Sequence, residues 1–232
     1  MLVRGLPDSA RKRLFDIVVA SAMLVLAAPI MLVCVVAIKL YDGGPVLYCG
    51  ERVGLCGRRF RLLKFRTMVP DAGRLGGTST PDDDPRLLPF GSLMRRLKLD
   101  ELPNLFNVVR GEMSFVGPRP QVAWAVKLYT EEQHELLSVR PGITDYASLR
   151  FRNEGEILRG SADPDRDYLE KIAPEKIKLG LEYVHTRSVC VDLRIIAATI
   201  WAMMGGDPWR IVGARARPTE TLVPTVTEVP RP

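Results

Sequence analysis

The chain has 232 residues, 47% of them hydrophobic and 26% charged, which is enough for one domain with a real core and too much for a peptide-sized module. Its 33 Lys and Arg residues outnumber its 27 Asp and Glu residues, and the net charge of +6 favours anionic partners such as phosphates, nucleic acid or an acidic membrane surface. The four cysteines show no CxxC spacing and only two histidines are present, which argues against a disulfide framework and against a zinc site.

The N-terminal part of the chain predicts a membrane element. Residues 1–13 form a basic segment, and the run 17–38 that follows contains no charge. A helix of this length covers roughly 33 Å, enough to cross a bilayer. The run lacks the A-x-A-like exit of a cleaved signal peptide, so we expect residues 14–40 to remain as a membrane helix.

The charges around this run predict that the helix is re-entrant. Arg4, Arg11, Lys12 and Arg13 precede it and further cations follow it, and cationic flanks favour the cytoplasmic side of a membrane. One straight span cannot satisfy both flanks. We therefore expect a bend at Ala28 and Pro29, because proline removes a backbone hydrogen bond. The alternative is an ordinary span with a proline kink, which membrane helices tolerate.

The next two segments predict a hairpin and a loop. Residues 44–69 contain two short apolar runs separated by Gly54 and Gly57, with several cations among them, which indicates a small basic β-hairpin. Residues 70–89 are rich in Pro, Gly and Asp and have no periodicity. They predict a loop in which the acidic run 82–84 is solvated.

From residue 90 onward, apolar residues recur at helical spacing. We predict helices over 92–98, 102–110, 129–139, 174–185 and 191–204, the last amphipathic enough to lie on a membrane. Thr130 and Gln133 have the spacing of a capping box. Residues 213–232 have the composition of a disordered tail. The fold class is therefore an irregular α/β arrangement: one membrane helix, a small basic sheet and several interfacial helices.

Asp100 and Glu101 stand side by side just before the helical run 102–110. On their own they would be ordinary residues of a helix start. Here Arg95 lies just upstream, and Arg119 lies downstream between two prolines. Cations at a helix start form an anion site, and two carboxylates within it invite a divalent cation. The pattern predicts phosphoryl chemistry with Mg²⁺ or Mn²⁺, because paired His or Cys ligands for a softer metal are absent from the sequence.

Four segments of the chain resemble a known family. They read LKLDELPNLFNVVRGEMSFVGPRP, VRPGIT, KFRTM and RLFDIVVASAMLVLAAPI. They are similar to bacterial sugar transferases, and more narrowly to the small monotopic phosphoglycosyl transferases that start glycan assembly on a polyprenyl phosphate. The likeness runs from about residue 12 to about residue 202. It implies transfer of a sugar 1-phosphate from a UDP-sugar to undecaprenyl phosphate, with release of UMP, by a cytoplasmic catalytic domain at 41–212 on the inner membrane.

The resemblance also implies roles for individual residues. By position, Asp100 matches the nucleophile that forms a phosphosugar-aspartyl intermediate, and Glu101 matches the carboxylate that holds Mg²⁺. Arg95 and Arg119 match positions expected to bind phosphate oxygens, for which a guanidinium fork is suited. The basic strand supplies further phosphate-binding candidates, Lys64 and Arg66.

Two segments depart from the family pattern, and one other class of function stays open. Relatives often have Ser-Pro where this chain has Ala28 and Pro29, and GWAQVNGRN where residues 145–154 read DYASLRFRNE, which leaves the sugar open. A non-catalytic basic docking module at the membrane would also explain the charge and the apolar run. A nucleic-acid partner is not expected, because the cations lack interleaved aromatics or a recognition motif. The sequence does not fix an oligomeric state.

Overall fold

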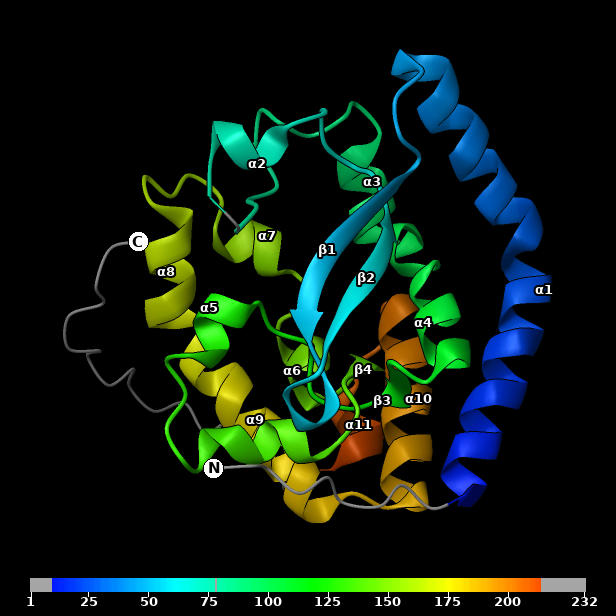
Figure 1. Cartoon of the computed structure of the whole chain (residues 1–232), viewed down its shortest axis with the longest axis vertical. Coiled ribbons are helices and arrows are strands. Elements are labelled where there is room, and N and C mark those ends of the chain that lie inside the picture. Colours follow the sequence, from blue (N-terminus) through cyan, green and yellow to red (C-terminus); the bar gives the residue numbers. More distant parts are fainter. Residues whose placement is uncertain (1–9, 78, 214–232) are drawn as a thin grey trace.

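The structure is a computed structural model that describes residues 10–77 and 79–213. These residues form a mixed fold of one long helix, two small sheets and a set of shorter helices (Figure 1). The mixed class, the long apolar N-terminal helix and the small sheet agree with the sequence. Most of the basic segment 1–13 and all but the first residue of the predicted tail lie outside the described residues.

Helix α1 (Ala10–Asp42) is continuous over 33 residues and is long and apolar enough to cross a membrane. It is longer at both ends than the predicted 14–40, and Pro29 lies inside it without interrupting the helix. The bend expected at Ala28 and Pro29 therefore does not divide α1 into two helices. Figure 1 shows α1 along one side of the molecule, bent near its middle rather than folded back on itself. A proline costs such a helix one backbone hydrogen bond, which a long helix can absorb as a bend.

One face of α1 packs against the rest of the protein along its length. The buried residues Asp16, Ala20, Cys34 and Ile38 recur at helical spacing. The opposite face is apolar and exposed, with Val25 75% and Leu26 77% accessible. Both halves of α1 therefore contact the same body, while a broad hydrophobic surface faces outward.

The predicted hairpin is confirmed. Strand β1 (Leu47–Val53) pairs antiparallel with β2 (Arg59–Phe65) in a register that places Cys49 opposite Leu63. The tight turn η1 (Leu55–Gly57) joins them, and Cys56 and Gly57 have positive φ there. A second sheet pairs β3 (Ser114–Val116) parallel with β4 (Gly142–Thr144), and the sequence did not predict it. Strands of three residues carry too little alternation to be read from sequence.

The predicted helical regions are confirmed, with one change of type. Segment 129–139 is largely a 3₁₀ helix, η3, and the capping box before it forms, with Gln133 N–H donating to Thr130 Oγ1 at 3.3 Å and Thr130 N–H donating to Gln133 Oε1 at 3.1 Å. The helical elements after the hairpin are α2 (Ala72–Leu75), α3 (Gly91–Arg96), η2 (Leu99–Glu101), α4 (Asn104–Arg110), α5 (Ala123–Val126), η3 (Gln133–Ser138), α6 (Tyr146–Arg150), α7 (Glu154–Ile157), α8 (Pro164–Lys171), α9 (Ala173–Thr186), α10 (Val189–Met203) and α11 (Trp209–Val212).

The acidic run 82–84 is not simply solvated, which corrects the prediction for this loop. Asp84 is buried and accepts hydrogen bonds from the Arg86 guanidinium at 2.6 to 3.1 Å. Asp83 accepts from the Gly160 N–H at 3.2 Å. A guanidinium that pairs with a buried carboxylate offsets the cost of burying its charge, and here the partner is only two residues away in the chain. The loop is thereby fastened to the segment after α7.

The main core lies where α1, α4, α6, α9 and α10 meet β3. Its fully buried members include Val108, Val116, Tyr183 and Ile195. Helix α4 lies between β2 on one side and α1 on the other, as the contacts of α4 with both elements show (Figure 1). The short turn η2 precedes α4, so the packing of α4 fixes the position of Asp100 and Glu101.

Candidate active site

Asp100 and Glu101 lie in the 3₁₀ turn η2 and do not cap a helix. The N-cap of α4 is Pro103, and neither η2 nor α4 has a side-chain hydrogen bond at its start. Lys98, just before the turn, has φ of +56°, an uncommon conformation for a residue with a Cβ. Such backbone strain persists only where the surrounding structure enforces it. Because neither carboxylate makes a cap hydrogen bond, the capping explanation for Asp100 and Glu101 is wrong.

Glu101 is held by two cations from different parts of the fold. Arg119 donates to both carboxylate oxygens, with Nη1 3.1 Å from Oε2 and Nη2 bound to Oε1. Lys64, in β2, donates to Oε1 at 3.1 Å. The Glu101 side chain is only 8% exposed. Burial opposes its ionisation, but Arg119 and Lys64 outweigh burial and hold the pKa of Glu101 well below its usual value. Glu101 is thus a fixed anion.

Asp100 is buried beside Glu101 but lacks a comparable set of partners. Its Oδ2 is 3.8 Å from Lys64 Nζ, too long for a hydrogen bond. Its Oδ1 is buried and finds no hydrogen-bond partner in the described part of the chain. Burial raises the pKa of Asp100, and the charges of Lys64, Lys98 and Arg95 act in the opposite direction. A buried, unpaired carboxylate oxygen is costly and points to a reactive or ligand-binding role.

The structure brings together four of the six predicted site residues; of the other two, one lies near this cluster and one lies outside it. Asp100, Glu101, Lys64 and Arg119 form one cluster. Arg95, at the end of α3, is near enough for its charge to lower the pKa of Asp100. Arg66 is not in the cluster, because its guanidinium binds Asp42 at 2.8 Å and the Pro45 carbonyl at 2.6 Å. A buried arginine with these partners fastens the end of α1 and is not free for phosphate.

Two buried polar residues of α4 were missed by the sequence reasoning. Asn104 is 1% exposed, and its Oδ1 has no partner within the described residues. Asn107 is fully buried and binds β2. They are three residues apart in α4, so they lie on one face of this helix, which begins just after the turn that carries Asp100. The signal was present in the sequence, since two asparagines interrupt an otherwise apolar stripe.

The oxygen atoms of the cluster fit a hard divalent cation in part. No group of three or more His, Cys, Asp or Glu side chains capable of holding a metal occurs among residues 10–77 and 79–213. The available oxygens of the cluster are the Glu101 carboxylate and the unpartnered Oδ1 of Asp100. Mg²⁺ commonly takes only one or two protein carboxylates and completes its coordination with water and phosphate oxygens. The two carboxylates alone are therefore a partial donor set for such a cation.

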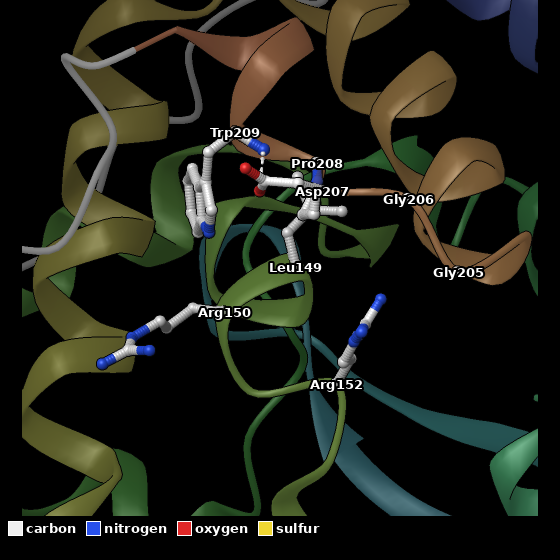
Figure 2. Close-up of a pocket in the computed structure, with 8 residues that line it drawn as sticks. All are labelled: Leu149, Arg150, Arg152, Gly205, Gly206, Asp207, Pro208 and Trp209. Carbon is white, nitrogen blue, oxygen red and sulfur yellow. Dashed lines mark hydrogen bonds between the residues drawn. The ribbon is translucent and has the colours of Figure 1, made fainter.

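A cavity of about 320 Å³ lies elsewhere, between α6 and the turn that joins α10 to α11. It is lined by Leu149, Arg150, Arg152, Gly205, Gly206, Asp207, Pro208 and Trp209. Figure 2 shows the side chains of Arg150 and Arg152 pointing away from one another, so they do not form an anion clamp. Arg152 donates to the Ala202 carbonyl at 3.0 Å, which joins the turn after α6 to the end of α10. The cavity contains none of the predicted site residues.

Comparison with known proteins supports the resemblance seen in the sequence. A family model described as "Bacterial sugar transferase" matches residues 7–206. The chain is 39% identical over 200 residues to the undecaprenyl-phosphate glucose phosphotransferase of Komagataeibacter xylinus, covering 83% of this chain and 36% of that protein. It is 36% identical over 207 residues to the exopolysaccharide production protein ExoY of Rhizobium meliloti (strain 1021), covering 83% of this chain and 84% of ExoY.

A third relative is the UDP-glucose:undecaprenyl-phosphate glucose-1-phosphate transferase of Caulobacter vibrioides. The identity is 34% over 200 residues, covering 85% of this chain and 71% of that protein. The chain thus spans about a third of one relative and most of the other two. The matched range, residues 7–206, contains α1 and the whole carboxylate and cation cluster. This chain belongs to the bacterial sugar transferase family and is a transferase.

Proposed function

We propose that this protein transfers a sugar 1-phosphate from a UDP-sugar to undecaprenyl phosphate through a covalent intermediate on Asp100. The observation that carries the proposal is the buried, unpartnered Oδ1 of Asp100 within a cluster of cations. The names of two relatives support the substrates, since both state undecaprenyl phosphate and that of the Caulobacter vibrioides protein also states UDP-glucose.

The reaction proceeds in two displacements at one phosphorus. A carboxylate oxygen of Asp100 attacks the phosphorus that carries the sugar, the bond to the bridging oxygen breaks, and UMP leaves with that oxygen. The sugar phosphate is then an acyl phosphate on Asp100. A phosphate oxygen of undecaprenyl phosphate attacks the same phosphorus, which releases the Asp100 carboxylate and gives the lipid-linked diphosphate sugar. Dividing the transfer in this way is the general advantage of covalent catalysis.

The cations provide what this chemistry needs. An anionic nucleophile must approach an anionic diphosphate, so positive charge must offset their repulsion. Lys64 lies within 3.8 Å of both carboxylates, and Arg95 and Lys98 bias Asp100 towards its ionised form. The Arg119 side chain is 30% exposed, so part of it remains accessible while its guanidinium holds Glu101. We assign phosphate binding to Lys64, Arg95 and Arg119, and exclude Arg66.

Glu101 and Asp100 would hold Mg²⁺ together with the diphosphate of the donor. When bound, the ion neutralises phosphate charge and polarises the phosphoryl oxygens. Mn²⁺, also an oxygen-preferring cation, is the alternative. Asn104 adds a buried amide oxygen one turn away from Asp100. Glu101 itself is kept ionised by Arg119 and Lys64, as a ligand for a hard cation must be.

Chelation should therefore stop turnover. With EDTA we expect UMP release to fall at least about a hundredfold, because several kcal/mol of charge stabilisation is lost, and Mg²⁺ should restore it. A readout independent of activity is the melting temperature, which Mg²⁺ with a UDP-sugar should raise in the native protein but not in the Glu101→Gln variant. Full activity in EDTA would exclude the metal.

The membrane arrangement that we propose is re-entrant, with both ends of α1 on the cytoplasmic face. At its start, Lys12 pairs with Asp192 at 2.6 Å, and Arg13 donates to the carbonyls of Val108 and Val109 at 2.7 and 2.8 Å. At its end, Asp42 pairs with Arg66. A helix whose two ends bind the same catalytic body cannot place one end across a bilayer from the other. Its bent, exposed middle would then be the part that enters the lipid.

Other outward apolar side chains support an interfacial position for the shorter helices. They are Leu93, Leu97, Phe106, Val189, Leu193, Ile200 and Trp201, each between 42% and 58% exposed. They belong to α3, α4 and α10, except Leu97, which directly follows α3, and α4 contacts α1. Exposed apolar area of this kind is typical of a protein that rests on a membrane. This position would bring Asp100 near the phosphate of a lipid-bound acceptor.

Thiol labelling in intact cells tests this topology. In a variant without Cys34, Cys49, Cys56 and Cys190, single cysteines at position 3 and at Glu51 report on the two flanks of α1. We expect a membrane-impermeant reagent to label neither until the membrane is opened, because both flanks are cytoplasmic. Labelling of position 3 from outside would show a straight span.

The alternative function is a non-catalytic docking module, which would explain the charge and the apolar run but leaves the two carboxylates unexplained, because they do not cap a helix. The decisive measurement is UMP release from a panel of UDP-sugars in the presence of undecaprenyl phosphate. Release with at least one sugar establishes the transferase activity and names the sugar. Absence of release with every UDP-sugar, from a folded protein in lipid, would overturn the proposed function.

A further inference from the structure

We infer that Asn107 is a positioning residue for the transfer reaction: its side-chain amide clamps β2 against α4 and so sets the distance between Lys64 and the Asp100 and Glu101 carboxylates. The inference rests on the proposed function, which gives the carboxylate pair its role. Asn107 contacts neither the carboxylates nor Lys64 by any hydrogen bond that we observe, so it acts through β2.

The amide of Asn107 replaces a missing strand. Strand β2 pairs with β1 along one edge only, so the other edge needs partners for its backbone groups. Asn107 Oδ1 accepts from the Leu63 N–H at 3.0 Å, and its Nδ2 donates to the Arg61 carbonyl at 2.8 Å. These two bonds replace those that the backbone N–H and C=O groups of a neighbouring strand would make. With Asn107 fully buried, no water can easily take over either bond.

A third bond fixes which way the amide faces. Nδ2 also donates to Glu112 Oε2 at 2.6 Å. In the flipped orientation, the amide oxygen would face both the Glu112 carboxylate and the Arg61 carbonyl, and the amide nitrogen would face the Leu63 N–H. All three contacts would then be repulsive. Glu112 therefore orients the clamp, and the clamp has one satisfied orientation.

The clamp lies close to the cluster along both elements that it joins. On β2, Lys64 is the residue directly after Leu63, and its Nζ reaches Glu101 Oε1 at 3.1 Å. On the other side, Asn107 belongs to α4, and the turn η2 that carries Asp100 and Glu101 comes just before α4 and also packs on β2. A shift of β2 along α4 would therefore move Lys64 relative to both carboxylates. A misplacement of about 1 Å at a reacting centre can cost about a hundredfold in rate.

The test uses the full chain in lipid and measures kcat for UMP release. Asn107→Leu keeps the approximate size of the side chain and removes its hydrogen bonds. We expect kcat to fall about a hundredfold. In a Lys64→Met background, where the positioned ammonium is gone, the same change should lower kcat by less than about twofold. A merely structural role for Asn107 would give the full loss in both backgrounds, and that result would overturn the inference.

Two further measurements keep the test decisive. Val108→Ala, in the same helix and equally buried, is the matched control for loss of stability and should keep kcat within about threefold. Hydrogen exchange at the Leu63 amide should be at least about tenfold faster in Asn107→Leu than in the native protein. If Asn107→Leu does not fold, Glu112→Ala, which removes only the orienting bond, should show the same changes to a smaller degree.

These readouts separate the clamp from the proposed function. If the native protein releases no UMP, the proposed function fails, and unchanged Leu63 exchange in Asn107→Leu would independently refute the clamp. If the native protein is active and Asn107→Leu retains its full kcat, the clamp does not position the reacting groups, while the transfer reaction stands.

Discussion

Replacing Asp100 by asparagine is expected to lower turnover on the order of ten-thousandfold or more, the scale seen when a covalent catalytic group is removed. Asparagine keeps the shape of the side chain but has no anionic oxygen to attack phosphorus. The fold should persist, because Asp100 Oδ1 makes no hydrogen bond in the described chain and burial already disfavours the charge. The variant should melt at or above the temperature of the native protein.

The covalent step has a signature of its own. Without undecaprenyl phosphate, the native protein should release one equivalent of UMP and then stop, and the Asp100→Asn variant should release none. Mass spectrometry of the stalled protein should find the added sugar phosphate on Asp100. Asp84→Asn is the matched control, since Asp84 is also buried beside guanidinium, and it should keep activity within about tenfold. An adduct on any other residue would disprove the assignment.

Arg119→Met should damage stability and activity together. The change leaves Glu101 buried with Lys64 as its remaining close cation. Removing one partner of a buried ion pair costs about 3 kcal/mol of the free energy of unfolding. Loss of the guanidinium should also lower kcat at least about a hundredfold, because phosphate charge is no longer balanced. Thermal melts in lipid or detergent, together with UMP release, measure the two effects.

The double variant separates them. Adding Glu101→Gln to Arg119→Met removes the unpaired charge, so most of the stability should return while activity stays low.

The stability that Glu101 contributes depends on pH, and the sign of this dependence follows from the direction of its pKa shift. Since Arg119 and Lys64 lower the pKa of Glu101 in the folded state, the stability that it contributes is present above the usual pKa of about 4.3 and disappears as pH falls through the folded value. The difference in the free energy of unfolding between the native protein and Arg119→Met should therefore become smaller as the pH is lowered. A difference that grows in acid would contradict this account.

The sequence predicted those elements whose pattern involves residues that are near one another in the chain. Hydrophobic periodicity located α1, α4, α9 and α10, and glycines placed the turn between β1 and β2. The capping box at Thr130 and Gln133 was also readable, because both of its hydrogen bonds join residues three apart. In these cases the partners are near in sequence, so composition and spacing carry the information.

The failures concern partners that are distant in sequence. Arg66 and Lys64 look equivalent in a basic strand, but their side chains meet different carboxylates, Asp42 and Glu101, which only the packing of α1 and α4 decides. The parallel pairing of β3 with β4 joins segments more than twenty residues apart and leaves no alternation in three-residue strands. The clamp at Asn107 likewise depends on β2 lacking a second neighbour, which is a property of the assembled sheet.

The contacts at the start of α1 make this long apolar helix a structural part of the folded protein. Arg13 occupies the carbonyls at the C-terminal end of α4, and Lys12 neutralises Asp192, whose other oxygen accepts from the Tyr183 hydroxyl at 2.8 Å. A chain trimmed to begin after α1 would expose the core at Ala20 and leave these groups without their cations. We therefore expect deletion of α1 to destabilise the remaining protein, and a helix substituted for α1 would have to retain Lys12, Arg13 and the buried face.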